Sequence, residues 1–217
     1  MKALLAILMG GVLLIASFFA TVLLCIVAFV WVNPGVSTLM VRRATQGTEI
    51  RTPRFVPLAQ LPSYARTGIL YLEDHNFYTH WGIVWGAIQE AWAANQRLGY
   101  EAYGGSTITQ QLARTLFLTP DKNWIRKGSE AVIALMLEAV LSKDRILELY
   151  LNSIEWGPGV FGIEAAARYH YGTGVRNLDK EQLARLLAIV TSPVRFSVKT
   201  FAKNPGMVAR YRALINR

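Results

Sequence analysis

Two adjacent acidic side chains close an apolar stretch and are the first residues in the chain placed to do chemistry. Glu73 and Asp74 directly follow Ile69, Leu70 and Leu72, whose spacing is that of the buried face of a helix. Glu73 should therefore leave the helix at the edge of the core, where a half-desolvated carboxylate has a tunable pKa. Such an acid suggests chemistry, and a solvated helix end is the simpler alternative.

A second polar group gathers at the start of a later helix. Gly104 and Gly105 free the backbone just before Ser106, which can cap a helix running to about Leu118. Such a start offers backbone N–H groups and hydroxyls to an anion. The polar side chains within the next turns are Gln110, Gln111 and Arg114. The alternative is a plain serine cap without a ligand.

A third group combines two cations with an acid. Arg126 and Glu130 are four residues apart and Lys127 and Glu130 three apart, so the three side chains share one face of a helix and can pair. An ordinary surface ion-pair cluster is the competing interpretation. The helix that carries them is expected at 123–141, with a core stripe made of Ile125, Val132, Leu135, Met136 and Ala139.

The elements that must position these groups are mainly helical. Helical spacing recurs from residue 63 onward, and no alternating strand pattern persists beyond a few residues. Further helices are expected at 63–73, 83–98, 143–152 with Ser142 as cap, 164–169 and 183–190, and a last one from Asn204-Pro205. Asp179 and Gln182 resemble a capping pair. One globular domain at 58–217 follows, preceded by a proline-containing linker at 34–57.

The amino-terminal segment, residues 1–33, predicts a membrane anchor. No charged side chain interrupts the run from Ala3 to Val32, which is long enough to span a bilayer with tilt. Cys25, the only cysteine, excludes an intrachain disulfide. The chain carries 23 Lys and Arg against 14 Asp and Glu, a formal charge of +9, which suits anionic partners such as lipid headgroups or diphosphates. Charge alone leaves the topology open.

Four motifs in order resemble those of the membrane-anchored peptidoglycan glycosyltransferases, in particular the monofunctional type of glycosyltransferase family 51. The resemblance spans about residues 58–193. The motifs are Glu73-Asp74-His75-Asn76-Phe77 with His80 and Gly82, then Gly104 to Gln111, then Arg126-Lys127 with Glu130, and finally Lys143, Ile146-Leu147-Glu148 and Tyr150-Leu151-Asn152. The resemblance implies a lysozyme-like, mainly α fold with two lobes and a groove between them.

The resemblance also implies an activity. The family transfers a growing lipid-linked glycan strand onto lipid II with inversion, forming β-1,4 bonds and releasing undecaprenyl diphosphate. Glu73 matches the position of the general base, and we assign Glu130 to organising the diphosphate site. The residues implied in substrate binding are Asp74, Phe77, His80, Ser106, Thr107, Thr109, Gln110, Gln111, Arg114, Arg126, Lys127, Lys143 and Asn152.

Cofactors, partners and location follow from the same resemblance. Mg²⁺ or Mn²⁺ is expected to assist, held largely by the substrate diphosphate, and no metal site made by the protein is expected. The expected partners are lipid II, the growing strand, membrane lipids and other cell-wall synthesis or division proteins, but no nucleic acid. The chain is expected to cross the bacterial cytoplasmic membrane once, with its amino terminus cytoplasmic and its domain periplasmic or extracellular.

Two other functions compete with this interpretation. A lysozyme-like enzyme that cleaves the cell wall would share the fold and use one glutamate as a general acid. A non-catalytic, membrane-anchored scaffold would keep the groove without needing its acids. The chain also departs from the family pattern at 191–197, Thr-Ser-Pro-Val-Arg-Phe-Ser, where the fifth motif of the family is only approximate. Trp81, Trp85 and Trp92 are interpreted as core or membrane-surface aromatics, with stacking on a saccharide as the alternative.

Overall fold

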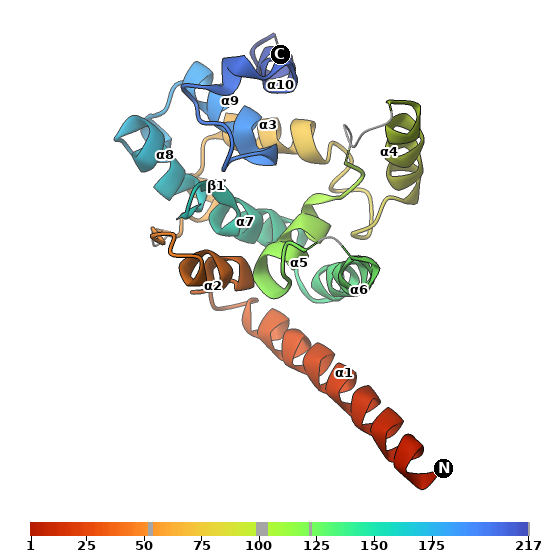
Figure 1. Ribbon diagram of the computed structural model, residues 1–217. Helices are drawn as coiled ribbons and strands as arrows, with labels where there is room; N and C mark the ends of the chain where they lie inside the picture. Colours follow the sequence, from red (N-terminus) through yellow and green to blue (C-terminus); the bar gives the residue numbers. More distant parts are fainter. Residues whose placement is uncertain (52–53, 99–103, 122, 217) are drawn as a thin grey trace.

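The computed structural model describes residues 1–51, 54–98, 104–121 and 123–216, and it is mainly helical, as the sequence predicts (Figure 1). One antiparallel hairpin pairs β1 (Glu155–Gly157) with β2 (Val160–Phe161). The helices are α1 (Lys2–Ala28), α2 (Thr38–Thr45), α3 (Ser63–Glu73), α4 (Trp85–Leu98), α5 (Ile108–Phe117), α6 (Trp124–Val140), α7 (Lys143–Ser153), α8 (Ile163–Tyr171), α9 (Lys180–Ala188) and α10 (Pro205–Ile215).

Helix α7 forms the centre of the domain. Its residues Ile146, Leu149 and Leu151 are fully buried, which its apolar composition favours. Helix α5 packs between α6 and α7, while α9 packs between α3 and α10. The end of α3 meets the start of α5, where Asp74 accepts the N–H of Ile108.

Most helix starts lie where the sequence predicts them, because their caps are local. Ser142 and Asn204 accept hydrogen bonds from the first turns of α7 and α10, and Asp179 forms a capping box with Gln182. The prediction of Ser106 as the cap of α5 is wrong. Thr107 caps this helix instead, since only Thr107 has a glutamine three residues later to complete a capping box.

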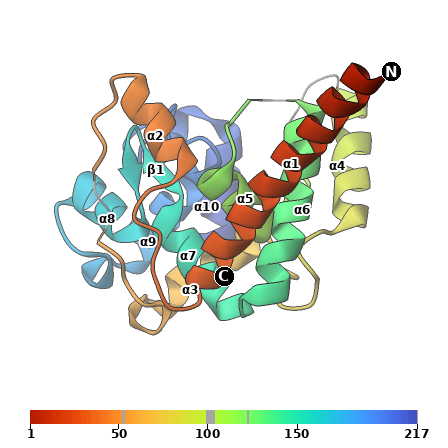
Figure 2. The same ribbon diagram turned by 90° about the horizontal axis from the view of Figure 1, so that it is seen from below.

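The predicted core stripe of α6 is also wrong. Ile125, Val132 and Leu135 are 84%, 45% and 47% exposed, and Ala139 is exposed as well, whereas Met136 is partly buried. The buried residues of α6 are Glu130, Ile133, Ala134 and Leu137. A stripe chosen by hydrophobicity alone misses a buried face that contains a glutamate. Helix α6 lies against α1 (Figure 2).

Helix α1 is long and apolar enough to cross a membrane. Of its residues, all of which the structure describes, only Val22 and Ile26 are buried, so it is not a core helix. It extends away from the domain in Figure 1 and crosses in front of α6 in Figure 2. Its last turns contact the domain, where Phe29 stacks on Phe117 of α5 with ring centroids 6.1 Å apart.

An arginine of α7 fixes the end of α1 to the domain. Arg145 donates from Nε to the carbonyl oxygen of Phe29 at 2.8 Å, and from Nη2 to the carbonyl oxygen of Val32 at 3.0 Å and to Oδ1 of Asn33 at 2.8 Å. Arg145 also pairs with Glu148, whose Oε2 accepts the N–H of Leu58 at 2.5 Å. The segment between these points, where a linker was expected, contains helix α2.

Candidate active site

Glu73 is the last residue of α3, and its neighbour Asp74 joins that helix end to the start of α5. Asp74 has non-helical backbone angles, and its Oδ2 accepts the N–H of Ile108 at 3.0 Å. His80 donates from Nε2 to both Asp74 oxygens at 2.9 Å. Because Nδ1 of His80 accepts the Gly82 N–H at 3.0 Å, the ring proton lies on Nε2.

The start of α5 is held by its own cap. Thr107 donates from Oγ1 to the carbonyl oxygen of Gly82 at 2.6 Å and accepts from the N–H of Gln110 at 3.2 Å. The loop before it approaches α4 so closely that a Cβ on Gly105 would lie 2.6 Å from the carbonyl oxygen of Ala87. Side-chain hydrogen bonds thus connect the end of α3, the loop at Gly82 and the start of α5. They are made by Asp74, His80, Thr107 and Gln110.

The Glu73 carboxylate is 7% exposed and has two side-chain partners. Gln111, one turn into α5, donates from Nε2 to Glu73 Oε2 at 3.0 Å. Arg210 of α10 pairs with Oε1 and also donates from Nε to the carbonyl oxygen of Ala188 at 3.1 Å. Both oxygens are therefore fixed in direction, and each keeps a lone pair for a further proton donor.

Tyr150 of α7 controls the orientation of Gln111. Its hydroxyl donates to Gln111 Oε1 at 3.0 Å, which leaves Nε2 to face Glu73. Complete burial, together with the negative charge of Glu73, raises the pKa of Tyr150 well above its ordinary value near 10. Tyr150 therefore stays protonated and remains a donor at any ordinary pH.

A cationic cluster lies beside this carboxylate. Glu130 is fully buried, and it pairs with Arg126 and with Lys127, whose Nζ lies 2.5 Å from Glu130 Oε1. Lys127 also donates to Ser106 Oγ at 2.9 Å. The side chain of Gln111 reaches back to the Ser106 carbonyl oxygen at 3.4 Å. Gln111 and Ser106 thus connect the two glutamates, and the predicted pairing of Arg126, Lys127 and Glu130 is confirmed.

A groove of about 350 Å³ opens next to these groups. Arg43 in this groove is neutralised by Glu155, with Nη2 2.8 Å from Oε2. Within the part of the chain that the structure describes, no carboxylate pairs with Arg114. The groove therefore offers Arg114 as a free cation near Arg126. Its lining residues are Leu39, Arg43, Gln111, Arg114, Thr115, Pro120, Arg126, Ile154, Glu155, Val190, Thr191 and Pro193.

Besides Asp74, His80, Thr107 and Gln110, four more of the residues implied in substrate binding make contacts within the fold. Phe77 is fully buried, with the Lys143 ammonium 4.5 Å from its ring centroid. Lys143 and Thr109 both bind Glu138 Oε1, at 2.8 and 2.6 Å. Asn152 is 3% exposed and hydrogen-bonds both backbone groups of Val56. The structure does not bring these side chains to the groove.

Arg210 and Tyr150 are site residues that the sequence reasoning missed. The contact of Arg210 with Glu73 joins residues 137 positions apart, so no local motif reveals it. A signal exists nonetheless: Arg210 lies three residues after Met207 and four before Leu214, both buried, and so falls on the inner face of α10. An arginine on a buried face requires an acidic partner.

The fold and the site define a mainly helical, lysozyme-like enzyme with one apolar helix, a carboxylate at a helix end and cations beside it. The family model described as Transglycosylase matches residues 41–217. The chain is 44% identical over 182 residues to a biosynthetic peptidoglycan transglycosylase of Dechloromonas aromatica, covering 81% of this chain and 78% of that protein. Proteins of the same name from Pseudomonas putida and Pseudomonas aeruginosa are 42% and 40% identical over 201 residues, covering 90% of this chain and 83% and 84% of theirs.

The chain therefore belongs to the transglycosylase family and is a peptidoglycan glycosyltransferase. The family membership expected from the four ordered motifs is confirmed.

Proposed function

We propose that this enzyme polymerises lipid II by transferring the growing lipid-linked strand onto it with inversion, forming β-1,4 bonds and releasing undecaprenyl diphosphate. The observation that carries the proposal is the connection of Glu73 to the cationic cluster through Gln111 and Ser106. Such a site offers a base on one side and stabilisation of a leaving anion on the other. The names of the relatives describe biosynthesis of the same polymer.

Glu73 is proposed to accept the proton of the acceptor 4-hydroxyl as the new bond forms. Its position supports this role, because Gln111 and Arg210 fix both oxygens while leaving a lone pair on each. A base held in one orientation loses less entropy on reaching the transition state. Arg210 touches Glu73 rather than substrate in this arrangement, and so it is a positioning residue.

The diphosphate leaves as an anion and needs cations rather than a proton donor. Arg114, Arg126 and Lys127 are proposed to supply them. Lys127 is 33% exposed and so can reach a ligand, while Glu130 is fully buried behind it. Glu130 is therefore proposed to hold Arg126 and Lys127 in place rather than to transfer protons.

A divalent cation is proposed to act at the diphosphate. Within the described ranges, no three His, Cys, Asp or Glu side chains gather to hold a metal, and Glu130 already has two cationic partners. The divalent cation is therefore proposed to be held by the oxygens of the substrate diphosphate.

Helix α1 is proposed to cross the bacterial cytoplasmic membrane, with the amino terminus cytoplasmic and the domain outside, where lipid II is polymerised. The exposed tryptophans Trp81, Trp85 and Trp92 and the exposed apolar side chains of α6 support contact of this part of the domain with lipid. A wall-cleaving hydrolase is disfavoured, because it would need a protonated glutamate and no cation cluster.

Replacing Tyr150 by phenylalanine tests the orientation of Gln111. The variant keeps the packing but loses the donor to Oε1, so we expect kcat/KM for lipid II to fall about tenfold, the value of one hydrogen bond of about 1.4 kcal/mol. Steady-state kinetics at equal concentrations of folded protein measure this.

The raised pKa of Tyr150 also predicts that the wild type loses stability as the pH rises past about 10, because the unfolded chain then releases a proton that the folded chain keeps.

The proposed function is tested with purified full-length protein, lipid II and Mg²⁺ in detergent. We expect long glycan chains, resolved by electrophoresis, and release of undecaprenyl diphosphate in step with consumption of lipid II. Shortening of preformed glycan without use of lipid II would favour the hydrolase. Binding of lipid II by a folded protein that makes no polymer in any detergent or lipid would favour the scaffold.

A further inference from the structure

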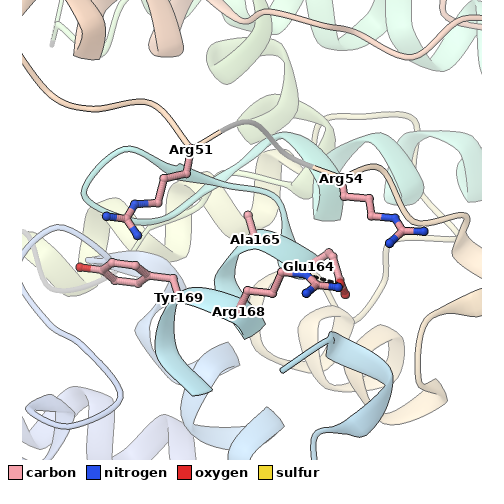
Figure 3. Close-up of a pocket in the computed structure, with 6 residues that line it drawn as sticks. All are labelled: Arg51, Arg54, Glu164, Ala165, Arg168 and Tyr169. Carbon is pink, nitrogen blue, oxygen red and sulfur yellow. Dashed lines mark hydrogen bonds and ion pairs between the residues drawn. The ribbon is translucent and has the colours of Figure 1, made fainter. Parts of the chain in front are cut away.

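A second pocket, of about 240 Å³, shares no lining residue with the groove among those described. It lies between the chain near Arg51 and Arg54 on one side and helix α8 on the other (Figure 3). Its six lining residues, here called the arginine pocket, are Arg51, Arg54, Glu164, Ala165, Arg168 and Tyr169. None of these residues has a role in the reaction proposed above.

The arginine pocket has more positive than negative charge. Its single acid, Glu164, is already committed: Oε1 accepts from Arg168 Nη2 at 2.8 Å, and Oε2 accepts the N–H of Val175 at 2.8 Å. Arg168 remains 57% exposed beside it, so part of its guanidinium can bind something else. Among the residues that the structure describes, no carboxylate pairs with Arg54. The lining therefore carries three arginines against one acid, and this excess of positive charge can attract an anion.

The position of Arg51 is fixed by the β hairpin. Its backbone N–H donates to the carbonyl oxygen of Gly159 at 2.9 Å. Gly159 has φ +70°, and a Cβ there would lie 2.1 Å from the carbonyl oxygen of Glu49. The guanidinium of Arg51 lies over the Tyr169 ring, 4.7 Å from its centroid, and its pairing with the exposed Glu49 is loose at 3.6 Å. Arg51 is thus held through both its backbone and its side chain, on the opposite side of the pocket from Arg54 (Figure 3).

The chemistry of the pocket favours a carboxylate. Arginine presents paired N–H donors in a plane, which match the two oxygens of a carboxylate. The volume suits a small side group rather than a disaccharide. Phosphates of membrane lipids are a poorer match, because α8 lies on the left in both views while α1 extends to the right (Figures 1 and 2).

The hairpin places this pocket next to the catalytic groove. Glu155, at one end of the hairpin, lines the groove, and Val160, at the other, bridges to Arg51 of the arginine pocket. The resemblance to the family implies that each lipid-linked disaccharide carries a pentapeptide, and we propose that the arginine pocket binds a carboxylate of these stem peptides on the glycan strand. The inference rests on the proposed function, since that function supplies the peptides. It adds a point of substrate recognition away from the reacting sugars.

The direct test is titration of full-length protein in neutral detergent with a soluble stem pentapeptide, followed by NMR. We expect the free acid to bind and the same peptide with every carboxylate amidated to bind at least about tenfold more weakly, as for a hydrogen bond to a charged group. Arg54→Gln should weaken binding of the free acid to the same extent. Arg54 is chosen because its replacement leaves the Glu164 pair intact.

The matched control is Arg212→Gln, which removes the same charge from an exposed position on α10 that lines neither pocket and should bind like the wild type. Equal binding of both peptides, or of the Arg54→Gln variant and the wild type, would overturn the proposal. So would an effect of Arg54→Gln confined to vesicles of anionic phospholipid, because the ligand would then be a headgroup. The titration needs no turnover, so a wild type that fails to polymerise lipid II contradicts the proposed function without deciding this one.

Discussion

Glu73→Gln is expected to reduce lipid II polymerisation by at least about a thousandfold, within the range for loss of a general base. The amide keeps the size of the side chain and an oxygen for Arg210, but it cannot take the proton of the acceptor hydroxyl. Arg210 keeps the Ala188 carbonyl as an acceptor but loses its charged partner, so we also expect a loss of about 1–3 kcal/mol in stability, which leaves the protein folded. Glycan formation per mole of folded enzyme, with folding checked by the thermal midpoint, measures the effect.

Glu181→Gln is the control for this prediction, because it makes the same chemical change at a 54% exposed carboxylate that also pairs with an arginine. It should keep wild-type activity, since a surface pair contributes little. A folded Glu73→Gln enzyme that retains a tenth of the wild-type rate would show that another group accepts the proton. In that case Glu73 would be a positioning residue.

Glu130→Gln is expected to affect both stability and activity. The substitution leaves two cations without their shared buried carboxylate, and breaking a buried pair costs about 3–5 kcal/mol. Since Lys127 is 33% exposed and Arg126 13%, solvent screens part of that loss, and we expect about 2–3 kcal/mol. We expect polymerisation by the folded fraction to fall about a hundredfold, because the two cations no longer hold the geometry that the leaving diphosphate requires.

Glu138→Gln separates the two effects. Glu138 lies on the same helix, is 4% exposed and pairs with Lys143. Its replacement should cost comparable stability with a smaller fall in activity per folded molecule. If the two variants lose the same activity after correction for folding, the role of Glu130 is structural only. Denaturation midpoints and initial rates, measured on the same preparations, decide between these outcomes.

The sequence predicts the helical frame well because helix ends depend on neighbouring residues. Ser142, Asp179 and Asn204 each act on a backbone N–H within the next three residues, so their pattern is sufficient. The buried face of α6 is different, because its orientation depends on what packs against it. Hydrophobicity selects Ile125 and Val132 there, although the domain turns Glu130 inward.

The contacts of the site can be predicted from the sequence where they are local, but not where they join distant parts of the chain. The pairing of Glu130 with Arg126 and Lys127 follows from helical spacing alone. The contact between Glu73 and Arg210 does not, since it depends on α10 packing against α9 and α9 against α3. Motif membership also does not distinguish a residue that lines the groove from one that supports it. Asn152 lies within a family motif, yet it holds the backbone of Val56.

The hydrogen bonds of Arg145 to the end of α1 have a consequence for the direction in which the groove faces. A domain on a flexible linker could rotate relative to its helix. Here, three hydrogen bonds from Arg145 to Phe29, Val32 and Asn33 hold α1 and the domain in one fixed relative orientation. With α1 crossing the membrane as proposed, the direction in which the groove faces around the membrane normal is then set by the face of α1 that a neighbouring helix contacts. Adding one residue to the exposed part of α1 would turn that direction by about 100°, the angle per residue of an α-helix.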